Sequence, residues 1–326
     1  MHGNMKSPKA RVKGSLSIVM PCFNEEDTLL LTHETLNKLC LKWLLSGLIT
    51  HYELLFVNDG SNDNTLDVLL GLHNRDKNVA VVDLRKNVGF QGAITAGLFS
   101  AKGDMVVSID ADLQDDPEKI EEMINKYYEG FDMVLGVRNN RDSDPFLKRL
   151  FAETYYRTLK VFGVTSVYNH GDYRLLSRGI VEELKNFPER VRYLRSLIFE
   201  IEPKFACVYY TRVKRKLGKA SFTFLKSLSL AIDGMTSFTS APIRLFSFLG
   251  LLMFFLSVIG GILILFIRFY WLLAIPGWAS LALIVLFFGG IQNLSIGIVG
   301  EYVSKIYIEN KQRPLYIIRN IHRHND

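Results

Sequence analysis

The chain has 326 residues, of which 48% are hydrophobic, and a formal net charge of +6. This length accommodates one sizeable soluble domain and a membrane part, and the share of hydrophobic residues is high for a purely soluble protein. Three widely spaced cysteines exclude a disulfide framework and a cysteine-based zinc site. Basic residues occur without an intervening acid between positions 203 and 232, which favours phosphates or anionic lipid headgroups as partners. Nucleic acid is not expected, because no nucleic-acid-binding motif accompanies the charge.

Short β-branched segments alternate with helical ones from residue 16 to about residue 136. The expected strands are 16–20, 53–57, 79–84, 105–109 and 133–137, and the expected helices between them are 25–45, 65–74, 91–101 and 117–128. This βαβ series predicts an α/β fold with a mostly parallel, doubly wound sheet. Ligands of such sheets bind beyond the carboxyl ends of the strands.

Three of the loops that follow the expected strands are polar and rich in turn-forming residues. The first strand runs into Pro21–Glu26, the second into Asn58–Asp63, and the fourth into Asp110–Gln114. Because the carboxyl ends of parallel strands meet at one edge of a sheet, we expect these three loops to converge on one site.

The loop after the fourth strand carries Asp110, Asp112 and Gln114 at intervals of two residues. Three oxygen ligands from one loop suit a hard divalent cation such as Mg²⁺ or Mn²⁺. Such a cation usually holds a phosphate. Taken alone, the same residues are equally typical of a solvated turn.

Two long apolar segments, 245–267 and 278–300, lie near the C-terminus. Each is long enough to cross a hydrocarbon core of about 30 Å, which needs roughly 20 helical residues. Lys and Arg on both outer flanks predict a hairpin with both ends in the cytosol. The segment before it, 222–244, alternates apolar and polar residues at helical spacing. It predicts a helix in the plane of the lipid headgroups, with a packed soluble helix as the alternative.

The expected organisation follows from these segments. It comprises an N-terminal tail (1–14), a cytosolic α/β domain (15–221), amphipathic juxtamembrane helices (222–244), two transmembrane helices within 245–300, and a cytosolic C-terminal tail (301–326). The N-terminal tail lacks an apolar signal sequence. We therefore expect a multi-pass protein of the plasma (inner) membrane, with the α/β domain and both termini in the cytosol.

Several motifs together resemble family 2 glycosyltransferases with a GT-A, Rossmann-like fold. The motifs are Ser17–Glu26, Asn58–Thr65, Asn87-x-Gly89, Asp110–Gln114, Gly171–Arg178 and Asn310-x-x-Arg313-Pro314-x-Tyr316. The nearest branch is that of the polyprenyl-phosphate glycosyltransferases, which includes bactoprenol glucosyltransferases and dolichyl-phosphate mannose synthases. The resemblance implies inverting transfer of one sugar from a nucleotide sugar to a polyprenyl phosphate at the cytosolic membrane face. It also allows a homo-oligomer.

The resemblance assigns roles to individual residues. The implied donor-binding residues are Pro21, Phe23, Glu25, Asp59, Asp110, Ala111, Arg138, Arg212 and Arg215; the implied ligands of Mg²⁺ or Mn²⁺ are Asp110, Asp112 and Gln114; and the implied catalytic residues are Asp112 and Asp172. Arg138 is equally typical of a surface arginine, and Asp172 of a structural partner for Arg174 or Arg178.

Two positions depart from the family pattern. Asn58 stands where the family more often has the first acid of an Asp-Asp pair, which leaves Asp59 as the expected acceptor. The segment Gly218–Phe222 replaces the family's Gly-x-Ser-Lys-Tyr, so the usual lysine is missing and Lys219 is the candidate substitute.

The expected reaction is transfer of glucose from UDP-glucose to undecaprenyl phosphate in the lipid bilayer. GDP-mannose or the nucleotide derivative of an amino sugar are alternative donors. A non-catalytic membrane adaptor that retains an inactive transferase domain is the alternative of a different class.

Overall fold

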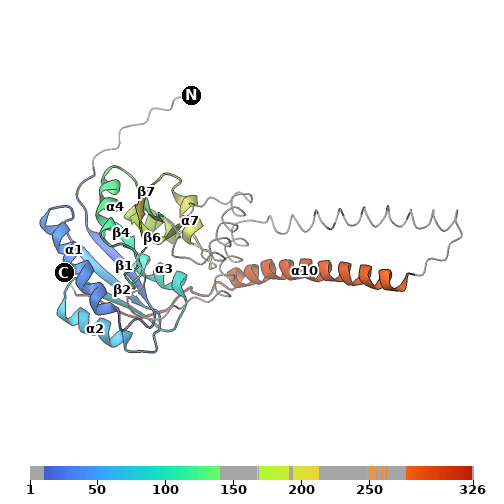
Figure 1. Ribbon diagram of the computed structural model, residues 1–326. Coiled ribbons are helices and arrows are strands. Elements are labelled where there is room, and N and C mark those ends of the chain that lie inside the picture. Colours follow the sequence, from blue (N-terminus) through green and yellow to red (C-terminus); the bar gives the residue numbers. More distant parts are fainter. Residues whose placement is uncertain are drawn as a thin grey trace, which may run out of the picture.

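The structure is a computed structural model that describes residues 11–139, 167, 169–190, 194–212 and 277–324, with six isolated positions between 248 and 262. It consists of an α/β part and a long helix, α10 (Trp278–Asn310), that extends away from it. Figure 1 also shows the C-terminus back beside the α/β part.

One sheet of eight strands forms the centre of the described α/β part, in the order β7-β5-β6-β4-β1-β2-β3-β8. The strands are β1 (Leu16–Cys22), β2 (Tyr52–Asn58), β3 (Val79–Leu84), β4 (Met105–Ser108), β5 (Met133–Arg138), β6 (His170–Ser177), β7 (Phe205–Tyr210) and β8 (Ile318–His322). The pairs β1–β2, β1–β4, β2–β3 and β5–β7 are parallel. In contrast, β6 runs antiparallel to β4 and β5, and β8 runs antiparallel to β3. The α/β prediction is confirmed, but the sheet is mixed.

Helices cover both faces of the sheet. They are α1 (Leu29–Leu45), α2 (Thr65–Arg75), α3 (Phe90–Ser100), α4 (Lys119–Tyr128), α6 (Arg178–Lys185) and α7 (Leu194–Ile201). Successive residues of β1 separate onto the two faces: Ile18 packs in the cluster that contains α1, α2 and α4, and Val19 in the cluster that contains α3, α6 and α7. Because both faces are covered, the central strands are mainly apolar and do not alternate between apolar and polar residues.

The five strands and four helices predicted from the sequence are present, with one clear shift of a boundary. Helix α1 begins at Leu29, not at residue 25. The preceding backbone is held in a turn, in which Asn24 has a φ of 56° and the backbone N–H of Glu25 donates to the Thr65 hydroxyl at 2.9 Å. These contacts with the residues after β2 hold the backbone outside the helical conformation, and the helix begins four residues later than predicted.

The predicted transmembrane hairpin is not supported. Within the described residues, no helix combines the length and the apolar character needed to cross a membrane. The predicted second span, 278–300, forms the first part of α10, where Gln292 and Asn293 interrupt the apolar run. The predicted first span, 245–267, and the juxtamembrane segment, 222–244, lie outside the described residues except for the isolated positions.

After α10 the chain returns to the sheet, which the sequence did not predict. The backbone N–H of Arg85 donates to the carbonyl of Ile317 at 3.0 Å, and β8 then pairs with β3. The Arg319 guanidinium lies 3.2 Å from the Asp83 carboxylate of β3. The last strand of the chain thus closes the outer edge of β3.

Candidate functional site

The loops after β1 and β2 are joined by hydrogen bonds at the carboxyl edge of the sheet. The backbone N–H of Asn24 donates to the Ser61 hydroxyl at 3.1 Å, and that of Asp59 donates to the carbonyl of Cys22 at 2.9 Å. Of the predicted donor-binding residues here, Pro21 is half-buried and Phe23 is exposed. Glu25 accepts a hydrogen bond from the Thr28 hydroxyl at 3.2 Å.

Asp59 holds the turn that precedes α3. Its two carboxylate oxygens accept hydrogen bonds from the backbone N–H groups of Val88 at 2.7 Å and Gly89 at 3.0 Å. Burial raises the pKa of Asp59 above its ordinary value, although both hydrogen bonds oppose the shift. Gly60 has a φ of +61°, and a Cβ there would lie 2.6 Å from the backbone nitrogen of Asn87. The loop after β2 therefore needs glycine to pack against the turn after β3.

The structure gives a physical reason for the asparagine at position 58. The Asn58 amide donates to the buried Asp83 carboxylate at 2.8 Å, and its carbonyl accepts from the backbone N–H of Ser61 at 3.2 Å. A carboxylate at position 58 would face that of Asp83 without a proton between them. An amide can donate to the Asp83 carboxylate and accept from the Ser61 N–H at the same time.

The loop after β4 gathers carboxylates. The backbone N–H of Gln114 donates to Asp112 Oδ1 at 3.1 Å, which closes a local turn. The carbonyl of the buried Ala111 accepts from the Thr32 hydroxyl at 2.7 Å. Burial raises the pKa of Asp110, and the carboxylates of Asp115 and Asp112 raise it further, to about 7. Within the described part of the chain, Arg212 only partly offsets the negative charge at this loop.

A divalent cation fits this set of groups. Among the described residues, no cluster of three or more His, Cys, Asp or Glu side chains is arranged to hold a metal ion. Asp110, Asp112 and Gln114 instead offer two carboxylates and one amide oxygen. Mg²⁺ is typically bound by one or two carboxylates, completed by substrate phosphates and water. The raised pKa of Asp110 marks the place where added positive charge stabilises the carboxylates.

Two of the predicted arginines lie beside the carboxylates of this loop. Arg138 is the last residue of β5, and Arg212 lies two residues beyond the end of β7. Arg212 Nη2 is 3.7 Å from Asp110 Oδ2. Both guanidinium groups also approach Asp115, which is not among the site residues predicted from the sequence. The predicted residues Arg215 and Lys219 lie outside the described part of the chain.

Asp172 lies on β6 beside the end of β4, where the Ser108 hydroxyl donates to the Asp172 carbonyl at 2.5 Å. Its carboxylate is paired with the buried Arg174 and receives Arg195 Nη2 at 2.8 Å and Nε at 3.1 Å. Burial favours the protonated form, but Arg195 and Arg174 outweigh it and hold the pKa well below its ordinary value. Arg178, the other partner considered from the sequence, donates to the carbonyl of Gly103 instead.

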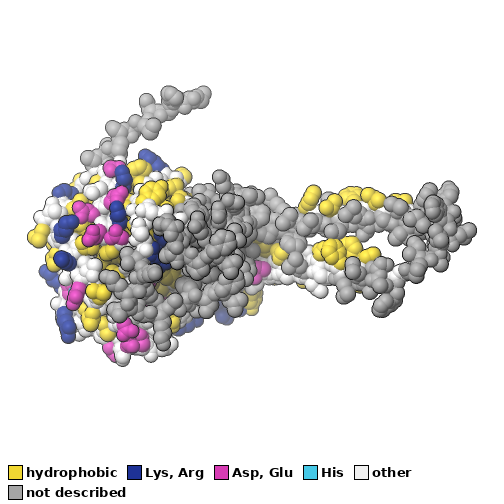
Figure 2. All heavy atoms as spheres, viewed as in Figure 1, with side chains coloured by type: hydrophobic (Ala, Val, Ile, Leu, Met, Phe, Trp, Pro, Cys, Tyr) yellow, Lys and Arg dark blue, Asp and Glu magenta, His cyan; other side chains and the backbone are white. Residues whose placement is uncertain are grey.

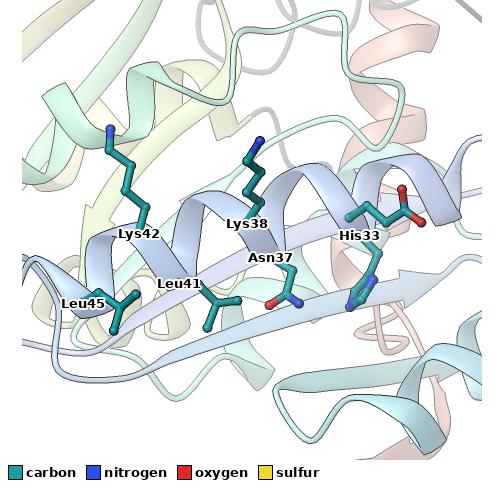
Figure 3. Close-up of a pocket in the computed structure, with 7 residues that line it drawn as sticks. His33, Asn37, Lys38, Leu41, Lys42 and Leu45 are labelled. Carbon is teal, nitrogen blue, oxygen red and sulfur yellow. The ribbon is translucent and has the colours of Figure 1, made fainter.

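Two hollows lie outside the carboxylate loop. One of about 590 Å³ follows the outer side of α1 (Figure 3), and its lining includes none of the predicted site residues. The other, of about 370 Å³, lies between residues 86–88, next to the turn that Asp59 holds, and residues 313–317 after α10. The C-terminal segment therefore borders the same turn that Asp59 holds.

Residues 17–185 match the sequence model of the family described as Glycosyl transferase family 2. The chain belongs to this family. The uncharacterized glycosyltransferase YkoT of Bacillus subtilis (strain 168) is 43% identical over 306 residues, which cover 93% of this chain and 90% of that protein. The prophage bactoprenol glucosyl transferase homolog of Escherichia coli (strain K12) is 36% identical, over 94% of this chain and 99% of that protein. This glycosyltransferase thus resembles its relatives over nearly its whole length.

A solved structure is similar at a greater distance. The glucosyl-3-phosphoglycerate synthase from Mycobacterium tuberculosis, in complex with Mn²⁺, UDP-glucose and phosphoglyceric acid, is 18% identical with a TM-score of 0.45. The match covers 67% of this chain and 75% of that chain. This likeness is too remote to carry an inference about the ligands of the glycosyltransferase described here.

Proposed function

We propose that this glycosyltransferase transfers one glucosyl residue from UDP-glucose to undecaprenyl phosphate, with inversion at the anomeric carbon. Relatives with the name bactoprenol glucosyl transferase that match nearly the full length of the chain support the acceptor and the sugar. The structural observation that carries the proposal is the position of Arg212 beside the Asp110 loop, where cationic and oxygen-rich groups meet. A sugar diphosphate needs both kinds of group.

In the proposed reaction, a phosphate oxygen of the acceptor attacks C1 of the glucosyl group. The bond between C1 and the β-phosphate oxygen breaks, and UDP leaves with the electron pair. A divalent cation held by Asp110, Asp112 and Gln114 would neutralise charge on the leaving diphosphate. Arg212 offers N–H donors to the same phosphates, and a guanidinium group can bind them in a bidentate way.

The acceptor makes a strong general base unnecessary. The second pKa of a phosphate monoester is about 6, so an acceptor phosphate is largely dianionic at neutral pH. Arg174 and Arg195 engage both oxygens of Asp172 and disfavour its protonation. In this proposal, Asp172 therefore fixes the local charge and geometry next to the reacting groups and does not take up a proton.

We place the reaction at the cytosolic face of the plasma membrane, where a lipid-linked acceptor is found. The apolar side chains along α10 support contact with lipid. Those that are more than half exposed include Leu281, Val285, Ile296, Val303 and Ile306. Figure 2 shows such hydrophobic side chains along the helical extension. An apolar surface of this kind is typical of a binding face for lipid or protein.

The test is transfer by the purified full-length protein in detergent. It uses a panel of radiolabelled UDP- and GDP-sugars, undecaprenyl phosphate, and buffer with Mg²⁺, Mn²⁺ or EDTA. We expect label in the lipid phase from UDP-glucose, lost with EDTA and with Asp112→Asn, and a product of inverted anomeric configuration by NMR. Glu182→Gln, on the exposed side of α6, is the control that keeps activity. Label from GDP-mannose or an amino-sugar donor would change the proposed sugar. Absence of transfer from every donor would refute the proposal and favour the adaptor.

A further inference from the structure

The loop after β4 contains a fourth acidic residue that no predicted role explains. Asp115 follows Gln114 directly, and only 2% of its surface is exposed. A buried carboxylate is stable only when cations or hydrogen-bond donors compensate its charge. The groups around Asp115 therefore indicate what it does.

Three groups, from the ends of β5 and β7 and from Arg212 just after β7, approach one oxygen of Asp115. The Tyr210 hydroxyl donates to Asp115 Oδ1 at 2.7 Å. Arg212 Nε lies 3.5 Å and Arg138 Nη2 lies 3.9 Å from the same oxygen. Arg138 Nε in turn donates to the Tyr210 hydroxyl at 3.2 Å. Because Arg138 and Tyr210 are paired in register on β5 and β7, the sheet itself fixes this arrangement.

The charge of Asp115 attracts both arginines, but neither forms a short hydrogen bond with its carboxylate. Distances of 3.5 and 3.9 Å are too long for strong hydrogen bonds. Among the described residues, the buried Nε of Arg212 has no hydrogen-bond partner. A buried N–H without an acceptor is costly, and it therefore points to an acceptor that a ligand supplies.

The position of Arg212 identifies that acceptor. Its guanidinium spans from Asp115 to Asp110, whose Oδ2 lies 3.7 Å from Nη2. Phosphate oxygens brought to a cation at Asp110 would lie next to this guanidinium. Guanidinium groups bind phosphate through two parallel N–H donors, and the strength of such binding depends on orientation.

We propose that Asp115 is a positioning residue for the two arginines at the site where the donor diphosphate binds. It holds Arg212 directly and Arg138 through the Tyr210 hydroxyl. The site therefore favours a nucleoside diphosphate over a monophosphate. This inference rests on the proposed function. The opposite reading is that Asp115 only neutralises the arginines. In that case its removal would free positive charge and strengthen the binding of anions.

The two readings predict opposite changes in nucleotide affinity. Calorimetric titration of the full-length protein with UDP and with UMP, at a fixed Mn²⁺ concentration, measures the preference for the diphosphate. For Asp115→Asn we expect UDP affinity to fall about tenfold, the loss typical of removing a group that orients a ligand-binding residue. UMP affinity should stay within about twofold, because the monophosphate lacks the group that the arginines hold.

Two further variants separate positioning from structural damage. Tyr210→Phe removes only the hydroxyl between Asp115 and Arg138, and it should also weaken UDP more than UMP. If Asp115 acts through Arg212, adding Asp115→Asn to Arg212→Ala should cost less than it does alone. Asp132→Asn is the matched control, because it removes a carboxylate whose ion pair with Arg11 is partly exposed and lies outside the loop after β4.

Unchanged or tighter UDP binding by Asp115→Asn would overturn the inference. Equal losses for UDP and UMP, or fully additive losses with Arg212→Ala, would also overturn it. If Asp115→Asn does not fold, Tyr210→Phe decides by the same ratio of affinities. The outcome is independent of sugar transfer, since nucleotide binding can be measured in a protein that fails to glycosylate undecaprenyl phosphate.

Discussion

The pairing of Asp172 with two arginines predicts that Asp172→Asn destabilises the enzyme. The substitution removes the carboxylate that pairs with Arg174, whose side chain is buried and only 1% exposed. Removing one partner of a buried ion pair costs about 3–5 kcal/mol. The asparagine oxygen still accepts a hydrogen bond and Arg195 is partly exposed, so the lower end, about 3 kcal/mol, applies. For a chain of 326 residues, an unfolding entropy of about 2.1 cal/mol/K per residue converts this loss into a fall in Tm of roughly 4 °C.

The pH dependence of this effect has a definite sign. The pKa of Asp172 is depressed in the folded state, whereas an unfolded aspartate has a pKa of about 3.9. Its stabilising contribution is therefore complete above about pH 5 and is lost as the pH falls below about 4. The difference in Tm between the wild type and Asp172→Asn should be constant from about pH 6 to 8 and shrink in acid.

Thermal unfolding followed by circular dichroism measures this difference. The control, Glu182→Gln, removes an exposed carboxylate that pairs with Lys185 at 2.7 Å, and it should not change Tm measurably. Equal Tm values for Asp172→Asn and the wild type at pH 7 would refute the reasoning. So would a difference that grows as the pH falls below 4.

Three other changes probe the site loops. Gly60→Ala forces a Cβ to within 2.6 Å of the Asn87 backbone at a φ of +61°. It should lower the free energy of unfolding in urea by at least about 1–2 kcal/mol. It should also raise KM for the donor more than it lowers kcat. Because the pKa of Asp110 is raised to about 7, Mn²⁺ must displace a proton from this carboxyl group below that pH. The affinity of the protein for Mn²⁺, measured by EPR titration, should therefore fall about tenfold from pH 6 to 5. A pH-independent affinity would contradict this. Asn58→Asp places a second buried carboxylate against that of Asp83 and should lower the free energy of unfolding by about 2 kcal/mol at pH 7. The loss should shrink in mild acid, where one carboxyl group protonates, and Asp83→Asn in the same chain should repair it. Urea unfolding at pH 7 and in mild acid measures both effects.

The central part of the fold could be predicted from the sequence because its signals are local. Each of the first five strands is a short apolar run, and each is followed by its own helix or turn. The position of β6 between β4 and β5 could not be predicted in the same way. Its partners are set by antiparallel pairing between segments that are distant in the chain, and no local pattern specifies them.

In the site, too, features that follow from local sequence could be predicted, and contacts between distant segments could not. The convergence of the loops after β1 and β2 follows from parallel topology, and hydrogen bonds such as that between Asn24 and Ser61 confirm it. Asp115 was missed although it adjoins the predicted cation ligands, because its role depends on Tyr210 at the end of another strand. Likewise, the sequence suggested Arg174 as a partner of Asp172 but not Arg195, which α7 brings to it. The roles predicted for Asp112 and Asp172 in catalysis stay predictions.

The place of β8 sets an order of events during synthesis. Chains emerge N-terminus first, at about 5–20 residues per second, so β1 to β4 can pair while the rest of the chain is still being made. The outer edge of β3 stays open until residues 318–322 are available to pair with it. The segment 313–317, which packs beside the turn at residues 86–88, arrives equally late. The outer strand of the sheet and the segment beside residues 86–88 are therefore completed only after α10 has been synthesised, so a chain with a complete sheet already carries its apolar helix.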